Sequence, residues 1–104
     1  MSRMLLVIAL LAACSHKTPE EKLQKDFEPV KSWSATVQFA GEKYDANSVP
    51  RAFVRATIDA AEKEYDKAGK AIDKSQAQKD LRDQLRRELE SSRAAAERLK
   101  RRVS

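Results

Sequence analysis

Cys14 is the residue of this sequence whose chemistry is most clearly defined by its neighbours, and it is the only cysteine. A thiol is a strong nucleophile, so it can be alkylated or acylated. Leu11-Ala12-Ala13 precede it, and an apolar run begins at Met4, behind the positive charge of Arg3. A membrane-spanning helix needs about 20 apolar residues, and this run is about half as long. The segment therefore predicts a processing signal that takes no part in the fold.

These residues resemble the signal peptide of bacterial lipoproteins, which has an aliphatic residue, two small residues and then the cysteine, as in Leu11 to Cys14. The resemblance covers residues 1–14. It implies that the thiol is diacylglycerylated, that residues 1–13 are removed, and that Cys14 becomes an acylated N-terminus carrying palmitate-type chains. Two or three such chains hold a protein firmly on a membrane. We therefore expect a signal peptide at 1–13, a lipidated tether at 14–18 and a single small helical domain at 19–104.

Ser15, directly after the cysteine, bears on the destination of the protein. In many lipoproteins of Gram-negative bacteria an aspartate at that position retains the protein in the inner membrane. By resemblance to that sorting pattern, we expect a lipid-anchored protein of the cell envelope, in the outer membrane facing the periplasm rather than in the inner membrane. With its one thiol in a thioether, the chain has none left for a disulfide.

Other residue types that carry chemistry are sparse. His16, the only histidine, lies in the tether without a second histidine or cysteine to complete a metal site. Neither a glycine-rich phosphate loop nor a nucleophile with a nearby base is present, and the carboxylates alternate with lysines and arginines. We therefore predict no enzyme activity, no metal, no cofactor and no small-molecule substrate.

The composition predicts helices. Charged residues make up 36% of the chain and aromatic residues 6%, with only two glycines and three prolines, which is typical of long helices or a coiled coil. The fold class we expect is all-α: a helical hairpin with a long C-terminal helix that is continuous or broken, giving two to three helices. About 90 residues remain after the signal peptide, enough for one small domain.

The first helix should begin at Thr18 as N-cap, with Pro19 in the first turn and Glu21 completing a capping box. An apolar stripe at helical spacing follows, with Trp33 expected to be the main packing residue. The stripe consists of Leu23, Phe27, Val30, Trp33 or Ser34, Val37 and Ala40. Pro29 predicts a kink or a restart, and Gly41 predicts the end of the helix.

Residues 41–48 are rich in turn formers and predict a reversal of the chain, with Asn47 and Ser48 as N-cap candidates for the next helix. The second helix carries another stripe at helical spacing, which should pack on the first helix. This stripe consists of Phe53, Ala56, Ala60, Ala61, Tyr65, Ala68 and Ile72.

A third stripe resembles a heptad seam and does not keep the register of the second. It consists of Leu85, Leu89, Ser92, Ala96, Leu99 and Val103. Either the chain folds back near Ser75 into a three-helix bundle, or one helix of about 80 Å projects beyond a short hairpin. We favour the long or mildly broken helix, because Ser75-Gln76 is a weak turn signal and Gly69 is the only glycine after residue 50.

The C-terminal part is basic: residues 79–104 hold nine bases and five acids, a net of +4. An exported protein does not meet chromosomal DNA, so we expect no nucleic-acid partner, whereas phospholipid head groups, lipopolysaccharide phosphates and wall polymers are available polyanions. The bases near the end of the chain are the candidates for such binding, namely Arg93, Arg98, Lys100, Arg101 and Arg102. They could equally complement the helix dipole and keep the surface soluble.

Two functions remain open. In the first, the membrane-anchored chain is a helical interaction or adaptor module that contacts a partner protein, or a second copy of itself, through the C-terminal helix. The candidate contacts are Leu85, Leu89 and Leu99 on the seam and Tyr44 in the predicted loop. In the second, the chain is a structural tether that binds cell wall or lipopolysaccharide through its basic C-terminal helix.

Overall fold

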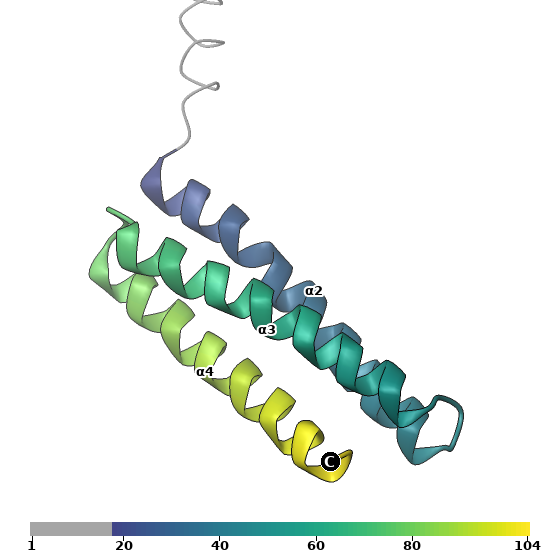
Figure 1. The fold of residues 1–104 in the computed structure, drawn as a ribbon. Helices are drawn as coiled ribbons and strands as arrows, with labels where there is room; N and C mark the ends of the chain where they lie inside the picture. Colours follow the sequence, from purple (N-terminus) through teal and green to yellow (C-terminus); the bar gives the residue numbers. More distant parts are fainter. Residues whose placement is uncertain (1–17) are drawn as a thin grey trace, which may run out of the picture.

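The computed structural model describes residues 18–104; the predicted signal peptide, Cys14 and His16 lie outside these residues. In this range the chain forms three helices and no strand: α2 (Pro19–Asp45), α3 (Arg51–Lys74) and α4 (Lys79–Arg102). Successive helices run antiparallel and form a bundle in which α3 contacts both neighbours, while α2 and α4 contact each other least (Figure 1). The all-α prediction is confirmed.

Helix α2 begins as its sequence predicts. The Thr18 hydroxyl accepts a hydrogen bond from the backbone N–H of Glu21 at 3.1 Å, and Pro19 occupies the first turn. The helix continues through Pro29, so no restart occurs there. The predicted stripe is confirmed: its aliphatic residues and Phe27 are buried. Trp33 is only half-buried, so it is not the main packing residue.

The end of α2 corrects two predictions. Gly41 lies inside the helix, where a Cβ would come within 3.3 Å of Leu99 Cδ1, so the glycine permits close approach of α4. The helix ends later, at Asp45, and Asn47, two residues on, takes the left-handed conformation with φ 58°. Ser48 N–H then donates to the Lys43 carbonyl and Asn47 N–H to the Tyr44 carbonyl, the hydrogen-bond pattern of a Schellman C-cap. Asn47 therefore belongs to the C-terminal cap of α2 and does not cap the next helix, and Pro50 takes the N-cap position of α3.

Helix α3 buries a face partly different from the predicted one. Its buried residues include Val54, Thr57 and Ile58 in the first half. They continue with Ala61, Tyr65, Ala68 and Ile72, as predicted. Phe53 and Ala56 are exposed and Ala60 is half-buried, so these three were wrongly assigned to the core.

The chain turns back after Lys74, so the preference for one long helix is wrong. Ser75 takes an extended conformation, with φ −72° and ψ 142°, and its hydroxyl accepts a hydrogen bond from Ala77 N–H at 3.0 Å. Ala77 is buried against the core at this turn. Helix α4 then runs antiparallel to α3 and buries its seam, completing a three-helix bundle (Figure 1).

Candidate functional site

The seam of α4 is already covered by the chain's own helices. Leu85, Leu89 and Leu99 are only 4–5% exposed and belong to the core that α2 and α3 share with α4. The turn at residues 75–78 lays α4 along α2 and α3, so these two helices cover the seam. In the closed bundle these three leucines offer no surface to a partner.

Tyr44, the fourth candidate contact, lies in the last turn of α2 and not in a loop. Its side chain is half-buried and packs against the core. The ring therefore contributes to the core, and only its exposed part could contact a partner.

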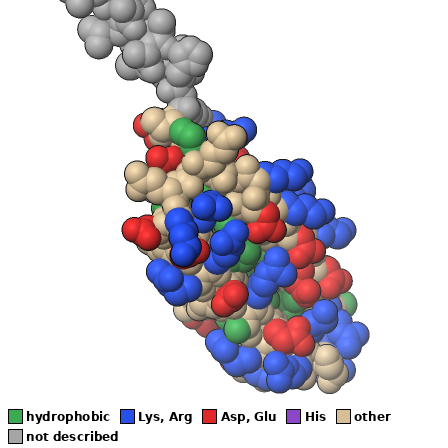
Figure 2. Space-filling model, turned by 90° about the vertical axis from the view of Figure 1, so that its left-hand side faces the viewer, with side chains coloured by type: hydrophobic (Ala, Val, Ile, Leu, Met, Phe, Trp, Pro, Cys, Tyr) green, Lys and Arg blue, Asp and Glu red, His purple; other side chains and the backbone are tan. Residues whose placement is uncertain are grey.

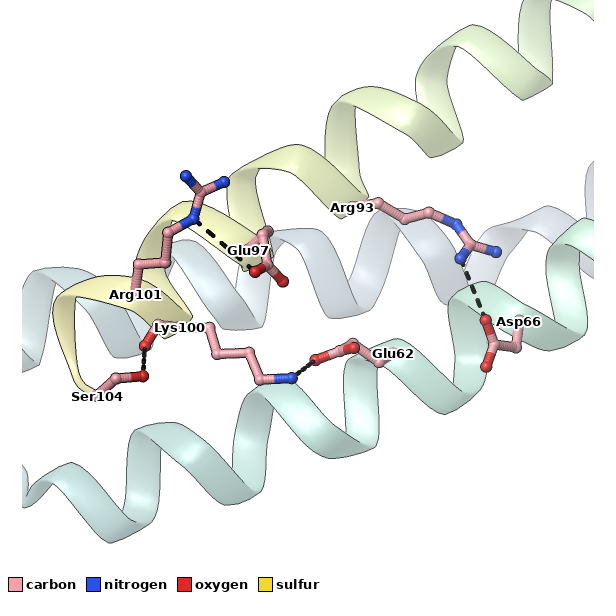
Figure 3. Close-up of polar contacts among 7 residues, drawn as sticks. All are labelled: Glu62, Asp66, Arg93, Glu97, Lys100, Arg101 and Ser104. Atoms are coloured by element: carbon pink, nitrogen blue, oxygen red, sulfur yellow. Dashed lines mark hydrogen bonds and ion pairs between the residues drawn. The ribbon is translucent and has the colours of Figure 1, made fainter.

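Four of the five basic candidates pair with carboxylates inside the bundle. Arg93 Nη1 lies 3.2 Å from Asp66 Oδ1 (Figure 3), and Arg93 Nη2 donates to the Tyr65 carbonyl at 3.4 Å. Lys100 Nζ lies 3.3 Å from Glu62 Oε1, linking α4 to α3 in the same way. The two remaining pairs are Arg101 with Glu97, within α4, and Arg102 with Asp45 of α2.

These ion pairs reduce the excess of positive charge that the C-terminal bases present. The hydrogen bond to Glu62, together with the charge of that carboxylate, raises the pKa of Lys100 above its ordinary value. Arg98 takes part in none of the ion pairs formed within residues 18–104 and lies at a groove between α2 and α4. Figure 2 shows blue and red side chains interspersed over the face drawn there. The excess of bases in α4 is thus partly balanced by acids of α3 and α2.

The groove between α2 and α4 has a volume of about 460 Å³ and reaches down to hydroxyl groups in the interior. Ser34, Tyr65 and Ser92, one residue from each helix, line it and are joined by hydrogen bonds. Ser34 Oγ lies 3.1 Å from Tyr65 Oη and 2.8 Å from Ser92 Oγ. Because these groups satisfy one another, the groove presents no unpartnered polar group at this point.

The most exposed large apolar side chains of the described residues are Phe39, 56% exposed, and Phe53, 48% exposed. Phe53 lies on the flank of α3 opposite to Glu62 and Asp66, whose flank faces α4. Phe39 lies outside the buried stripe of α2 and has the Lys43 ammonium group 5.3 Å from its ring centroid. Both rings therefore lie on the side of the bundle that α4 does not cover.

Two alanines extend the apolar surface of Phe53 along α3. Phe53, Ala56 and Ala60 recur three and four residues apart, so they form one stripe along α3. The contact between Ser34 and Tyr65 sets the register of the antiparallel pair and places Phe39 level with Ala60. We give the name outer face to the side of α2 and α3 that faces away from α4, which carries Phe39, Lys43, Phe53, Ala56 and Ala60.

The described residues contain no group of three or more histidine, cysteine, aspartate or glutamate side chains placed to hold a metal ion. Residues 18–104 also contain no helix long and apolar enough to cross a membrane. Cys14 and His16 lie outside this range, so their predicted roles stay predictions.

Comparison with known proteins gives no match: no family model, no curated protein and no solved structure is significantly similar to the chain. The fold and the surface therefore have to be interpreted from this molecule alone.

Sequence reasoning missed the outer face, although one signal was available. Phe39 falls outside the regular stripe of its helix, between Val37 and Ala40, and a large apolar residue off the stripe indicates either a second packing face or an exposed contact. Phe53 gave no comparable signal, because it fits a helical spacing with Ala56 and Ala60 as well as any core residue does.

Proposed function

We propose that this chain is a lipid-anchored protein of the bacterial cell envelope whose three-helix bundle binds a helix of a partner protein through the outer face. The match of Leu11 to Cys14 to the lipoprotein signal-peptide motif supports the anchor. Ser15, in place of the aspartate that retains many lipoproteins in the inner membrane, favours the outer membrane. The observation that carries the interaction is the exposure of Phe39 and Phe53 on helices whose shared core is complete without them.

The outer face has the chemistry of a helix-docking surface. Aromatic side chains are frequent anchors of protein interfaces, and the small side chains of Ala56 and Ala60 allow another helix to approach closely. Lys43, beside the Phe39 ring, can pair with a carboxylate at the rim of that partner. Burying the exposed half of each phenylalanine would contribute about 1 kcal/mol.

A modest interface is sufficient for an anchored protein. Lipidation confines the bundle to one membrane surface, and tethering of this kind raises the effective concentration of a nearby partner to the millimolar range. The proposed role is the helical interaction module that the sequence predicts, but the proposed contact surface is the outer face and not the α4 seam.

The anchor is tested at Cys14. Cells expressing the chain are fed an alkyne-bearing palmitate, and the wild type is compared with Cys14→Ala. We expect label on the wild type alone and a precursor that keeps residues 1–13 in the variant. Equal labelling, or unlabelled wild type, contradicts the lipoprotein assignment.

The docking surface is tested by photo-cross-linking in living cells. A photoreactive phenylalanine replaces Phe39 or Phe53 in turn, and the exposed Arg87 of α4 serves as the control position. We expect one dominant protein adduct from both outer-face positions and none from position 87. The adduct at position 53 should disappear when Phe39 is changed to Ser. Adducts of wall or lipopolysaccharide material alone would favour a structural tether instead.

Loss of the adduct has to be separated from loss of the fold. Phe39→Ser should change the free energy of unfolding by less than about 0.5 kcal/mol, because a half-exposed surface residue contributes little to the core. Phe27→Ala, at a residue that is 1% exposed, should cost about 3–5 kcal/mol. A large loss of stability in Phe39→Ser would show that the ring belongs to the core.

A further inference from the structure

A cleft lies at the end of the bundle from which the tether leaves. It has a volume of about 430 Å³ and separates the first turns of α2 from the last turn of α3. Figure 1 shows the start of α2 standing apart from the end of α3 at this point. Its lining includes the apolar Pro19, Leu23 and Ala71 and the charged Lys22, Asp26 and Lys74.

The covalent chain places this cleft near a bilayer, an argument that rests on the proposed lipidation of Cys14. Four residue steps separate Cys14 from Thr18, and a fully extended chain spans at most about 14 Å over that length. The polar layer on each side of a bilayer is about 5–7 Å thick. The cleft, which Thr18 lines, is therefore held within reach of phospholipid head groups.

The charged lining residues come from two helices and are not consumed by internal pairs. Lys22 and Asp26 project from α2 and Lys74 from α3, and all three are exposed. They take part in none of the ion pairs found within residues 18–104. The cleft thus offers two ammonium groups and one carboxylate above an apolar floor.

We propose that this cleft binds the head group of a zwitterionic phospholipid that carries a primary ammonium group. The phosphate diester lies between Lys22 and Lys74, and the ammonium group of the lipid pairs with Asp26. The glycerol edge of the lipid rests on Pro19, Leu23 and Ala71. A simple anion would leave Asp26 as a repulsive neighbour, whereas a head group of both signs satisfies all three charges.

Binding there would orient the molecule. The bundle would stand on the bilayer by the end that carries the anchor, with α2 pointing away from the surface. Phe39 lies twenty residues beyond Pro19, which corresponds to about 30 Å along the helix. The outer face would then be presented well clear of the head groups, where a partner protein can reach it.

The test is a titration of the bundle without its lipid. Residues 18–104 supply the whole core described above, so this segment is expected to fold alone, which circular dichroism checks first. Amide chemical shifts are followed while dihexanoyl phosphatidylethanolamine, dihexanoyl phosphatidylglycerol or inorganic phosphate is added below micelle-forming concentrations. We expect the largest shifts around Lys22, Asp26 and Lys74, with phosphatidylethanolamine binding more tightly than phosphatidylglycerol.

Substitutions assign the charges. Lys22→Gln and Lys74→Gln should each weaken binding of both lipids roughly tenfold, because each removes a charge-assisted hydrogen bond. Asp26→Asn should remove the preference for phosphatidylethanolamine and leave phosphatidylglycerol binding at least as tight. Lys63→Gln, at an exposed residue of α3 outside the cleft, is the matched control and should change neither affinity.

Two outcomes overturn the inference. Equal affinity for inorganic phosphate and both lipids would mean a general anion site, and shifts spread over the bundle without a maximum at the cleft would mean no site at all. Both are independent of the anchor, because the titrated segment lacks Cys14. Failure of palmitate labelling in cells would instead contradict the proposed lipoprotein while leaving the titration result intact.

Discussion

The Ser34 hydroxyl joins all three helices, so its removal tests how firmly α4 is held. Ser34 Oγ donates to Ser92 Oγ at 2.8 Å and lies 3.1 Å from Tyr65 Oη. A serine hydroxyl has a single hydrogen. Since that hydrogen is used toward Ser92, the Tyr65 hydroxyl must be the donor to Ser34. Ser34 is therefore the centre of the cluster, and each of the other two residues makes one of its bonds.

This connectivity predicts an order of costs. Ser34→Ala removes both bonds and should cost about 2 kcal/mol, at about 1 kcal/mol for each bond. Ser92→Ala and Tyr65→Phe each remove one bond and should cost about 1 kcal/mol. In the double variant Ser34→Ala/Ser92→Ala, the second change should add almost nothing, because the bond that it would break is already absent.

Urea and thermal unfolding of the four variants provide the measurement. In a domain of this size each kcal/mol corresponds to a change in Tm of about 4–8 °C. The slope of the unfolding free energy against urea concentration should stay unchanged, since none of the substitutions alters the surface exposed on unfolding. If Ser34→Ala costs no more than Ser92→Ala, or if the two costs add, water entering from the α2–α4 groove replaces the bonds and the hydroxyl cluster does not hold α4.

Two further predictions concern the contacts that α4 makes with α3 and α2. The pKa of Lys100 is raised by its bond to Glu62, so the pair stabilises the fold at neutral pH and this contribution is lost as the pH rises through the folded-state pKa. The difference in unfolding free energy between the wild type and Glu62→Gln should therefore begin to shrink above lysine's ordinary pKa of about 10.4 and close above the raised pKa of folded Lys100, and a constant difference contradicts the pairing. Gly41→Val should destabilise by about 1–3 kcal/mol through overpacking, because its Cβ would press on Leu99. Thermal unfolding should show part of this loss restored in Gly41→Val/Leu99→Ala, and an additive loss would refute the contact.

The start of the bundle could be predicted because local chemistry decides it. Thr18, Pro19 and Glu21 determine where α2 begins whatever packs against the helix, and the structure shows the expected bond from Glu21 to Thr18. The end of α2 was less predictable, because a glycine serves equally as a helix end or as a close-packing site. Gly41 serves as the second, and this depends on the position of Leu99, which lies 58 residues away in sequence.

The outer face could not be derived from periodicity for a related reason. The first half of α3 carries two apolar stripes, one through Val54 and Ile58 and another through Phe53, Ala56 and Ala60. Both have helical spacing. Which stripe enters the core is decided by the rest of the helix, where Tyr65 and Ile72 continue the first stripe and charged residues interrupt the second. The exposed aromatic ring therefore became visible only once the helix was placed against its neighbours.

The turn after Lys74 has a physical cause that the sequence contains. A seven-residue repeat continued from Ile58, Tyr65 and Ile72 falls on Lys79, Arg86, Arg93 and Lys100. The structure buries Leu85 and Leu99 instead, each one residue before a base of this series. Leu89 and Ala96 are also buried, and they stay in phase with the repeat of α3. One residue corresponds to about 100° of rotation around a helix, so a single continuous helix would carry these four bases on the seam.

Folding back relieves this conflict. With α4 as a separate antiparallel helix, the leucines turn into the core, while three of the four displaced bases reach the acids of α3. Arg86 then lies 3.2 Å from Asp73, and Arg93 and Lys100 make the ion pairs described above. A break in register was therefore a stronger indication of a turn than the absence of glycine and proline was of a continuous helix. The same break also withdraws the α4 leucines from any partner and leaves the outer face as the surface to be tested.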